Sequence, residues 1–199
     1  MVKMMSKNNK YNKLLDFLAE VGQLKRVRRS GWWTVGIKDC ESVAEHSFRC
    51  AIIGYCLAKM ERCDSHKTAL ICLFNDVHEA RINDLHKIVQ RYLDLKVIER
   101  KALKEQVSHL PYDIGSSIKR LMNELWNDRS RESIIARDAD ILECMLQGKE
   151  YYEQGYIQAK EFFDKPLSLL KTKSARTLAR ALKKWNSRSW CTKLAVMRR

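Results

Sequence analysis

Polar residues that can bind metal interrupt the apolar faces of three segments with helical spacing. His46 lies near the start of one segment, the pair Asn75-Asp76 follows a second, and Asp140 is embedded in a third. Burying a carboxylate is costly unless a cation or hydrogen-bond donors compensate its charge. Imidazole and carboxylate groups that converge from separate helices would form a divalent metal site. Each residue alone has an ordinary alternative, as a satisfied core histidine or as an aspartate that caps a helix or pairs with a cation.

Glu79 can add acid–base chemistry to such a site. It lies at i+3 from Asp76, so the two carboxylates can share one helix face. A carboxylate in that place could orient a water molecule at the metal or exchange a proton with it. The alternative is an exposed carboxylate at the end of a helix.

A basic and aromatic stretch before His46 offers groups that can recognise a nucleotide. Its guanidinium groups, Arg29 among them, can hold a phosphate through two parallel hydrogen bonds. An indole can stack on a sugar or a base, and Trp32 and Trp33 are the two candidates. Core packing beneath a loop is the alternative for either tryptophan.

The apolar periodicity predicts that helices position these residues. Only 7 Gly and 2 Pro occur among 199 residues, which argues against a fold made of many tight turns. No segment shows the alternation of a half-buried strand. We therefore expect an all-α fold of long helices with short connections. The expected helices cover residues 11–24, 43 onward, 65–79, 84–93, 95–108, 112–127, 130–154 and 168–186.

The helix that carries His46 has the clearest start signal. Ser42 and Glu45 form the S-x-x-E pattern of a capping box, in which each side chain accepts the backbone N–H of the other residue. His46 then lies in the first turns of the helix, near its core side. We expect its buried apolar stripe to consist of Phe48, Ala51, Ile52 and Tyr55.

The positive charge of the chain is concentrated at its C-terminal end. The net charge is +14, and residues 165–199 contain eleven Lys or Arg and no acid. Such a segment can bind nucleic acid, acidic lipid or another protein, but it can equally be a solvated or packed helix face. We expect residues 161–199 to form a basic helical extension packed on the same domain.

The composition predicts a cytoplasmic protein. No segment is apolar enough to cross a membrane, and the N-terminal residues lack the apolar core of a signal peptide. The 7 cysteines show no C-x-x-C spacing, and most lie among apolar residues, as small buried side chains do in a reducing compartment.

Four segments together resemble the HD-domain superfamily. They are G-Q-L-K-R-V-R-R-S-G-W at 22–32, E-S-V-A-E-H-S at 41–47, N-D-V-H-E-A-R-I-N-D-L-H-K at 75–87 and D-A-D-I-L-E at 138–143. Within that superfamily the resemblance is greatest to the small 5′-deoxynucleotidase-like proteins. It covers residues 12–155 and implies an HD-domain helical bundle, which we place at residues 1–160.

The resemblance implies a divalent metal held by a His, a His-Asp doublet and a distant Asp. By position, His46 matches the first ligand, Asn75-Asp76 the doublet and Asp140 the last. Asp138 faces another side of its helix, so only one of these two aspartates should point inward, and Asp140 matches the D-x-x-E pattern. A His and Asp site suits Mn²⁺, Co²⁺, Fe²⁺ or Zn²⁺ better than Ca²⁺.

The resemblance also assigns roles to residues beside the metal. It implies that Glu79 and Asp84 support nucleophilic attack and proton transfer. It further implies that Arg29 and Trp32 contact the nucleotide. The match of Arg29 is looser, because Ser30-Gly31 separates it from Trp32.

Asn75 departs from the family pattern, which has His at that position. An amide oxygen is a weaker ligand for transition metals than an imidazole nitrogen. Three interpretations are open: a deliberate substitution that traps substrate, a natural protein that binds metal less tightly, or a site that has lost catalysis but still binds nucleotides. His78, one helical turn on, is a conceivable substitute ligand, although its direction and its height on the helix match poorly.

We expect a metal-dependent phosphohydrolase of the kind that releases phosphate from (deoxy)nucleoside 5′-monophosphates. The interpretations of Asn75 leave its activity either weakened or lost. One alternative is another HD enzyme, a phosphodiesterase or a nucleoside triphosphate hydrolase. The other is a catalytically impaired protein that binds nucleotides, or that binds nucleic acid through its basic tail. The resemblance also implies a homodimer.

Overall fold

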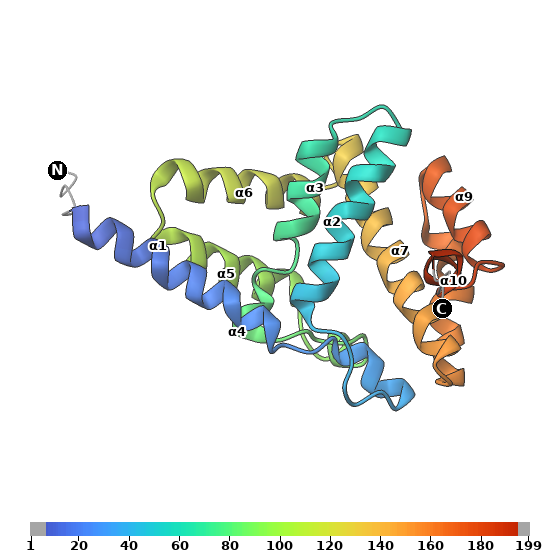
Figure 1. The fold of residues 1–199 in the computed structure, drawn as a ribbon. Helices are drawn as coiled ribbons and strands as arrows, with labels where there is room; N and C mark the ends of the chain where they lie inside the picture. Colours follow the sequence, from blue (N-terminus) through green and yellow to red (C-terminus); the bar gives the residue numbers. More distant parts are fainter. Residues whose placement is uncertain (1–6, 195–199) are drawn as a thin grey trace.

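The computed structural model describes residues 7–194, and the elements in this range are helical (Figure 1). Within the same range, the only strand-like feature is an isolated antiparallel bridge between Arg28 and Ser42, so the expected all-α fold is confirmed. None of these helices is both long and apolar enough to cross a membrane. The α-helices are α1 (Lys7–Val21), α2 (Val43–Met60), α3 (Ser65–Phe74), α4 (Glu79–Ile82), α5 (Leu95–Ser108), α6 (Tyr112–Trp126), α7 (Arg131–Glu153), α8 (Glu161–Asp164), α9 (Lys173–Leu182) and α10 (Ser189–Leu194). Short 3-10 helices link them: η1 (Gly22–Lys25), η2 (Ser30–Val35), η3 (Val89–Arg91), η4 (Ile157–Lys160) and η5 (Pro166–Leu169).

Capping side chains set the starts of the main helices. The predicted box is present at α2, where the Glu45 N–H donates to the Ser42 hydroxyl over 3.2 Å. Ser130 forms a second box with Ser133 at the start of α7. A cap of this kind stabilises a helix by ~1 kcal/mol, because it satisfies a backbone N–H that has no partner within the helix. Helix α2 therefore begins where the sequence predicts, and this places His46 in its first turn.

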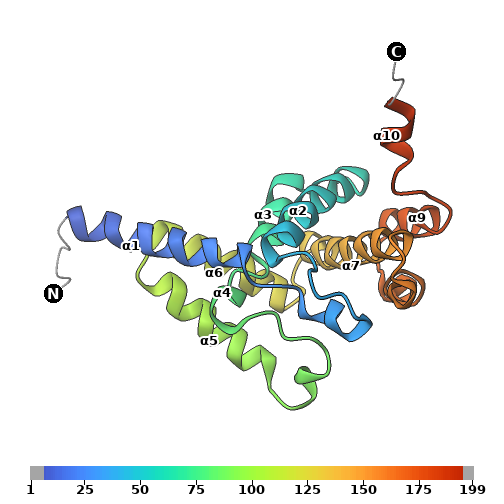
Figure 2. The ribbon, with the colours of Figure 1, turned by 60° about the horizontal axis from the view of Figure 1, so that its bottom comes forward.

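Helices α2, α3 and α7 pack against one another and carry the centre of the core (Figure 1). Leu57, Ile71 and Met145, one from each helix, are completely buried. Full burial of such a side chain contributes roughly 1.5–3 kcal/mol. Helices α1, α5 and α6 lie to one side of these three helices, and α9 packs on α7 at the other side (Figure 2).

A glycine allows the three central helices to approach closely. A β-carbon at Gly54 of α2 would lie 2.6 Å from Cys72 Sγ on α3 and 3.6 Å from the β-carbon of Ala139 on α7. The first of these distances leaves no room for a side chain in a close-packed interior. Gly54 thus serves the packing of the helices that carry His46 and Asp140.

The expected buried stripe of α2 is wrong for Phe48, Ile52 and Tyr55, which are exposed, whereas Ala51 is partly buried against the core as expected. Phe48 is 67% exposed and Ile52 is 49% exposed, whereas Cys50, Gly54 and Leu57 face the core. Apolar periodicity identifies a helix face but does not say whether that face meets the core. Here the close approach of α3 and α7 requires small side chains, so the larger apolar groups lie on the outer surface.

The segment expected to be a helix over 84–93 is a loop that contains only the short turn η3. Helix α4 ends at Asn83, which has a positive φ of 60°. The Asp84 carboxylate then accepts a hydrogen bond from the backbone N–H of Ser30, far away in the sequence. This tertiary contact replaces the helix start that Asn83-Asp84 predicts. The helix expected over 65–79 is likewise divided, into α3 and α4.

The basic C-terminal segment forms a shorter helix than the one expected over 168–186. Asp138 of α7 accepts hydrogen bonds from the backbone N–H groups of Lys171, over 2.9 Å, and Thr172, over 2.7 Å. Helix α9 begins directly after this contact and buries Ala175, Ala179 and Leu182. This part of the basic segment is therefore packed on the helical body.

Candidate metal centre and substrate pocket

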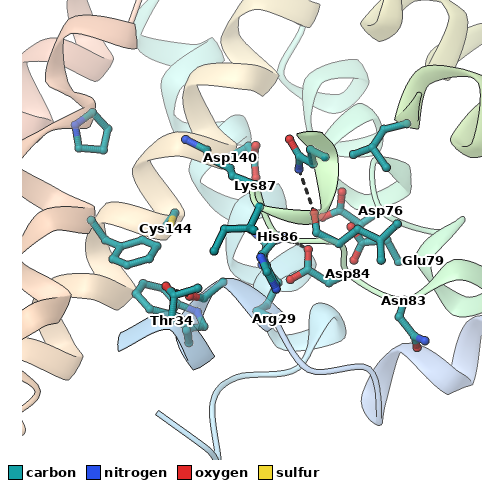
Figure 3. A pocket seen from close by; sticks show the side chains of 18 of the residues that line it. Arg29, Thr34, Asp76, Glu79, Asn83, Asp84, His86, Lys87, Asp140 and Cys144 are labelled. Atoms are coloured by element: carbon teal, nitrogen blue, oxygen red, sulfur yellow. Dashed lines mark hydrogen bonds and ion pairs between the residues drawn. The ribbon is translucent and has the colours of Figure 1, made fainter. Parts of the chain in front are cut away.

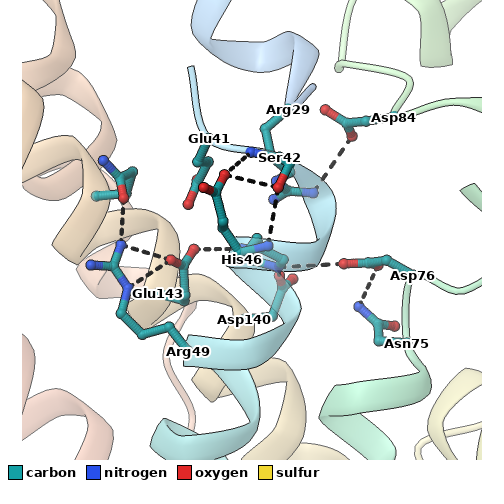
Figure 4. A network of polar contacts seen from close by, with 12 residues as sticks. Arg29, Glu41, Ser42, His46, Arg49, Asn75, Asp76, Asp84, Asp140 and Glu143 are labelled. Carbon is teal, nitrogen blue, oxygen red and sulfur yellow. Dashed lines mark hydrogen bonds and ion pairs between the residues drawn. The ribbon is translucent and has the colours of Figure 1, made fainter. Parts of the chain in front are cut away.

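His46 lies at the meeting point of three carboxylates (Figure 4). Its Nε2 atom is 3.0 Å from Asp140 Oδ1 and 3.4 Å from Asp76 Oδ2. Its Nδ1 atom contacts a carboxylate oxygen of Glu143. Helix α2 supplies the histidine, the turn between α3 and α4 supplies Asp76, and α7 supplies Asp140 and Glu143. The structure therefore brings together three of the four residues that the sequence predicts as metal ligands.

The two aspartates of α7 have separate functions. Asp140 faces His46, whereas Asp138 is turned toward the chain that precedes α9 and accepts its backbone N–H groups. This agrees with the choice of Asp140 from the sequence. Asp138 is instead a buried cap, which is the ordinary alternative for an aspartate within a helix.

The arrangement fits a divalent cation. His46 Nε2 and Asp76 Oδ2 are buried and have no hydrogen-bond partner among the described residues. Ligand atoms bound at about 2.1 Å to one cation lie roughly 3 Å or slightly more from one another, similar to the separations of His46 from Asp76 and Asp140. With a cation bound, the proton of the ring would be on Nδ1, which donates to Glu143, and the Nε2 lone pair would be free to bind the metal beside the two aspartates.

The same carboxylates control protonation of the histidine. Burial and the charge of Arg29 lower the pKa of His46, but contacts with Asp140, Asp76 and Glu143 outweigh them and hold that pKa well above its usual range. Burial raises the pKa of Asp76, and His46 together with Arg29 overcomes this and lowers it to about 2. Excess negative charge thus surrounds Nε2, and either a proton or a metal cation can compensate it.

Glu143 is a site residue that the sequence analysis used only to align a motif. Its completely buried carboxylate contacts His46, accepts a hydrogen bond from Arg49 Nε over 2.9 Å and forms an ion pair with the terminal nitrogen NH2 of Arg49 at 2.7 Å. The other terminal nitrogen of Arg49, NH1, forms an ion pair with Glu150 at 2.8 Å. Burial raises the pKa of Glu143, but the contacts with His46 and Arg49 outweigh burial, and the net pKa is below its usual value. The carboxylate therefore stays charged. A buried glutamate one turn after Asp140 was the signal that could have indicated this role.

Asn75 lies beside Asp76 without joining the group around His46 (Figure 4). Its amide nitrogen donates to Asp76 Oδ1 over 2.7 Å, which fixes the direction of that carboxylate. His78 does not replace it: its Nε2 is 3.9 Å from Glu99, and no close group of potential ligands among the described residues contains it. The role of Asn75 as a metal ligand stays a prediction.

A cavity of about 860 Å³ adjoins the metal centre (Figure 3). Asp76 and Asp140 are on its wall, together with Glu79. Cationic, apolar and aromatic side chains complete the lining, and the sequence analysis did not anticipate these. Among them are His86, Lys87, Ile88, Leu95, Arg137, Phe162 and Lys165. His86 and Lys87 end the segment 75–87 that carries the family resemblance, but no motif marks the others, because the loop after α4 and the segment around α8 meet only in the folded chain.

Arg29 and Asp84 reach this cavity as predicted, and they do so as a pair. The Arg29 terminal nitrogen NH1 is 3.5 Å from Asp84 Oδ1. The other Asp84 oxygen accepts the Ser30 N–H, and the Ser30 hydroxyl donates to the Asp84 carbonyl over 2.8 Å. Burial lowers the pKa of Arg29, but Asp76 and Asp84 raise it well above its usual range. The arginine is therefore a fixed cation, and the Asp84 carboxylate is already occupied in holding it.

Glu79 begins α4 and lies buried in the cavity wall. Its Oε2 atom has no hydrogen-bond partner among the described residues. Burial, Asp76 and Asp84 raise the pKa of Glu79 well above its usual range. A carboxyl group of this kind keeps its proton to a higher pH than an ordinary glutamate, which suits the predicted proton-transfer role.

Trp32 is a core residue at the edge of the cavity. It is only 2% exposed, and its indole N–H donates to Glu41 over 3.0 Å. Its ring packs on Tyr151 and Phe162, with centroids 5.0 Å and 4.4 Å away. The packing alternative therefore describes Trp32 well, and stacking on a nucleotide stays a prediction. Trp33, the other candidate, is exposed and does not line the cavity.

These helices and this site define a member of the HD domain family: residues 21–185 match the family model, and the chain belongs to that family. The resemblance seen in the sequence is thereby confirmed. The chain is 30% identical over 165 residues to the 5′-deoxynucleotidase HDDC2 of Dictyostelium discoideum. The aligned region covers 75% of this chain and 86% of the relative. It is also 30% identical over 156 residues to HDDC2 of Homo sapiens, covering 76% of this chain and 75% of that protein.

Solved structures agree with this assignment. A conserved hypothetical protein from Pyrococcus furiosus superposes with a TM-score of 0.72 and 31% identity, covering 85% of this chain and 97% of that one. A predicted coding region from Archaeoglobus fulgidus gives a TM-score of 0.63 and 33% identity, covering 87% and 94% of the two chains. The match extends over most of each chain, so the helical body is shared as a whole.

Proposed function

We propose that this protein is a metal-dependent phosphohydrolase that releases phosphate from (deoxy)nucleoside 5′-monophosphates. The observation that carries the proposal is the pair of buried atoms His46 Nε2 and Asp76 Oδ2, which have no hydrogen-bond partner among the described residues and lie beside Asp140 where the metal centre adjoins the cavity. The relatives named 5′-deoxynucleotidase support the substrate class.

The chain would hold the cation through His46, Asp76 and Asp140, with Asn75 as a further predicted ligand. This donor set suits Mn²⁺, Co²⁺, Fe²⁺ or Zn²⁺. A bound divalent cation would activate water and neutralise charge on the phosphoryl oxygens. Glu143 supports the site by accepting the Nδ1 proton of His46, which keeps Nε2 free for binding.

Arg29 and Glu79 supply the remaining chemistry from the cavity wall. The Arg29 guanidinium, held by Asp84, can bind two oxygens of a phosphate and keep the ester near the metal centre. Glu79, with its raised pKa, can donate a proton to the leaving 5′-oxygen or accept one from water. Both groups are fixed before substrate enters, so positioning and electrostatic stabilisation would provide most of the rate.

The cavity suits a nucleotide in size and lining. Its volume of about 860 Å³ is within the range of roughly 300–1,000 Å³ that small-molecule pockets occupy. Apolar groups such as Ile88 and Leu95 offer surface to a base, while Lys87 and Lys165 offer positive charge to phosphate.

The test is release of inorganic phosphate from a panel of deoxy- and ribonucleoside 5′-monophosphates, triphosphates and a phosphodiester. The metal-stripped protein is assayed alone and after addition of Mn²⁺, Co²⁺, Fe²⁺ or Zn²⁺. We expect metal-dependent turnover of monophosphates that is lost in Asp140→Asn and retained in Asp128→Asn, an exposed aspartate that pairs with Arg137 outside the metal centre. Turnover of the triphosphate or diester alone would assign another HD activity.

A second candidate is a nucleotide-binding protein without turnover, favoured by the amide at position 75. It predicts saturable nucleotide binding by calorimetry but no phosphate release with any of the four metals. Asn75→His would then restore turnover. If neither protein binds or hydrolyses any nucleotide, both candidates are wrong.

A further inference from the structure

Cys50 lies one helical turn after His46 on the buried face of α2. The Cys50 sulfur, a ring nitrogen of His46 and a carboxylate oxygen of Asp140 are all within 4.8 Å of one another. The i,i+4 spacing explains the placement, because it puts both side chains on the same side of the helix. A thiol is thus part of the same cluster as two of the candidate metal ligands.

The cluster needs a further donor. Position 75 holds an amide, and the nitrogen of that amide is directed at Asp76. His46 Nε2 and the two aspartates beside it, Asp76 and Asp140, supply three donors, whereas metal sites of this type use four or more ligand atoms. The buried atoms His46 Nε2 and Asp76 Oδ2 contact each other at 3.4 Å but have no hydrogen-bond partner among the described residues, which independently supports a bound cation at this place.

We propose that the Cys50 thiolate is a ligand of the metal, beside His46, Asp76 and Asp140. The inference rests on the proposed function to the extent that both require a bound cation. On binding, the S–H bond breaks, the proton leaves to solvent and a metal–sulfur bond forms; a cation deprotonates a coordinating thiol in this way. Sulfur shifts the preference of the site toward Zn²⁺, Co²⁺ and Fe²⁺ and away from Mn²⁺, which favours oxygen.

Cys72 provides a matched control. It is buried on α3, where its thiol donates to the carbonyl oxygen of Ala136 over 4.0 Å, and it lies close enough to Cys50 to raise the pKa of that thiol. It belongs to neither of the two close groups of potential ligands found in the described part of the chain. The two cysteines therefore share an environment but differ in their access to the metal centre.

The experiment is a titration of the metal-stripped full-length protein with Co²⁺, followed by absorbance. Thiolate ligation gives an intense sulfur-to-cobalt charge-transfer band in the near ultraviolet, separate from the weak visible bands that report any bound Co²⁺. We expect that band in the unmodified protein and in Cys72→Ser, and its loss in Cys50→Ser and Cys50→Ala. In the Cys50 variants, affinity for Zn²⁺ should fall by roughly tenfold or more relative to Mn²⁺, since even residues that only orient a ligand change metal affinity by about 10–100-fold.

The cobalt spectrum of the unmodified protein is by itself a sufficient test of the inference, even if the variants do not fold. Visible cobalt bands together with phosphate release, but without the near-ultraviolet band, would refute ligation by Cys50 and leave the proposed function standing. A band that persists in Cys50→Ala would also refute it. Absence of any Co²⁺ or Zn²⁺ binding would overturn both the ligation and the proposed function.

Discussion

The buried carboxylate of Glu143 holds the imidazole of His46 by its Nδ1 atom, on the side opposite the two aspartates. This contact fixes both the orientation of the ring and the nitrogen that carries the proton. Arg49 in turn holds Glu143. The metal centre therefore depends on a chain of charged groups that do not touch the cation.

Glu143→Gln is expected to weaken metal binding by about 10–100-fold, because an amide oxygen can accept the Nδ1–H hydrogen bond but lacks the negative charge that strengthens it. Calorimetric titration with Mn²⁺ measures the change. Glu150→Gln is the control, since Glu150 contacts the same Arg49 but not His46. Equal metal affinity in the Glu143 variant and the unmodified protein would remove Glu143 from the site.

Asn75→His is expected to bind divalent metal at least ~10-fold more tightly, since an imidazole nitrogen is a better ligand for transition metals than an amide oxygen. The variant should also be the more active phosphatase. Metal content after gel filtration and initial rates at saturating Mn²⁺ measure the two effects. If affinity and turnover are the same in both proteins, position 75 does not contribute a ligand.

Gly54→Ala is expected to destabilise the fold by about 1–3 kcal/mol, because its β-carbon would overlap Cys72 Sγ in a packed interior. Gly22→Ala is the control: a β-carbon there meets nothing within 4 Å, and removing a glycine tends to stabilise by roughly 0.4–1 kcal/mol. Urea denaturation followed by circular dichroism gives both values. A Gly54 variant as stable as the control would contradict the close approach of α2 and α3.

Glu20 is expected to make stability fall in acid. Burial raises the pKa of this carboxyl, but hydrogen bonds from Arg81 and Gln106 outweigh burial and bring the pKa below its ordinary value of 4.5. The folded state then holds fewer protons than the unfolded chain. The contribution is present above pH 4.5 and is lost as the pH falls from there through the lowered pKa.

Glu20→Gln should therefore reduce stability at pH 7 and have little effect in strong acid. The free energy of unfolding, measured by urea denaturation from pH 3 to 7, tests this. Glu105→Gln is the control, because Glu105 contacts the same Arg81 from a more exposed position, at 3.4 Å. A Glu20 variant with the same pH dependence as the unmodified protein would show that the contact carries no net stability.

Local signals predicted the parts of the site that single helices position. The capping box at Ser42 and Glu45 set the start of α2 and the height of His46. The spacing within α7 separated Asp140 from Asp138, because two residues on a helix face different directions. Both predictions need only the geometry of one helix.

Contacts between distant segments produced the features that the sequence did not predict. Phe48 and Leu57 look alike in an apolar pattern, and only the approach of α3 and α7 decides that the first is exposed and the second buried. Asp84 was expected near a helix start, but its carboxylate instead accepts the backbone N–H of Ser30. Lys165 enters the cavity wall from the C-terminal segment, where no motif marks it.

The candidate ligands also have a consequence for the abundance of the protein. His46, Asp76 and Asp140 come from α2, the turn between α3 and α4, and α7, and the helices α2, α3 and α7 form the core. The unfolded chain cannot assemble these groups, so a cation held by them would bind only the native state and would shift the folding equilibrium by mass action. A ligand at about 100 times its Kd contributes about 2.7 kcal/mol in this way. Cells short of the metal would lose folded molecules to proteolysis as well as activity.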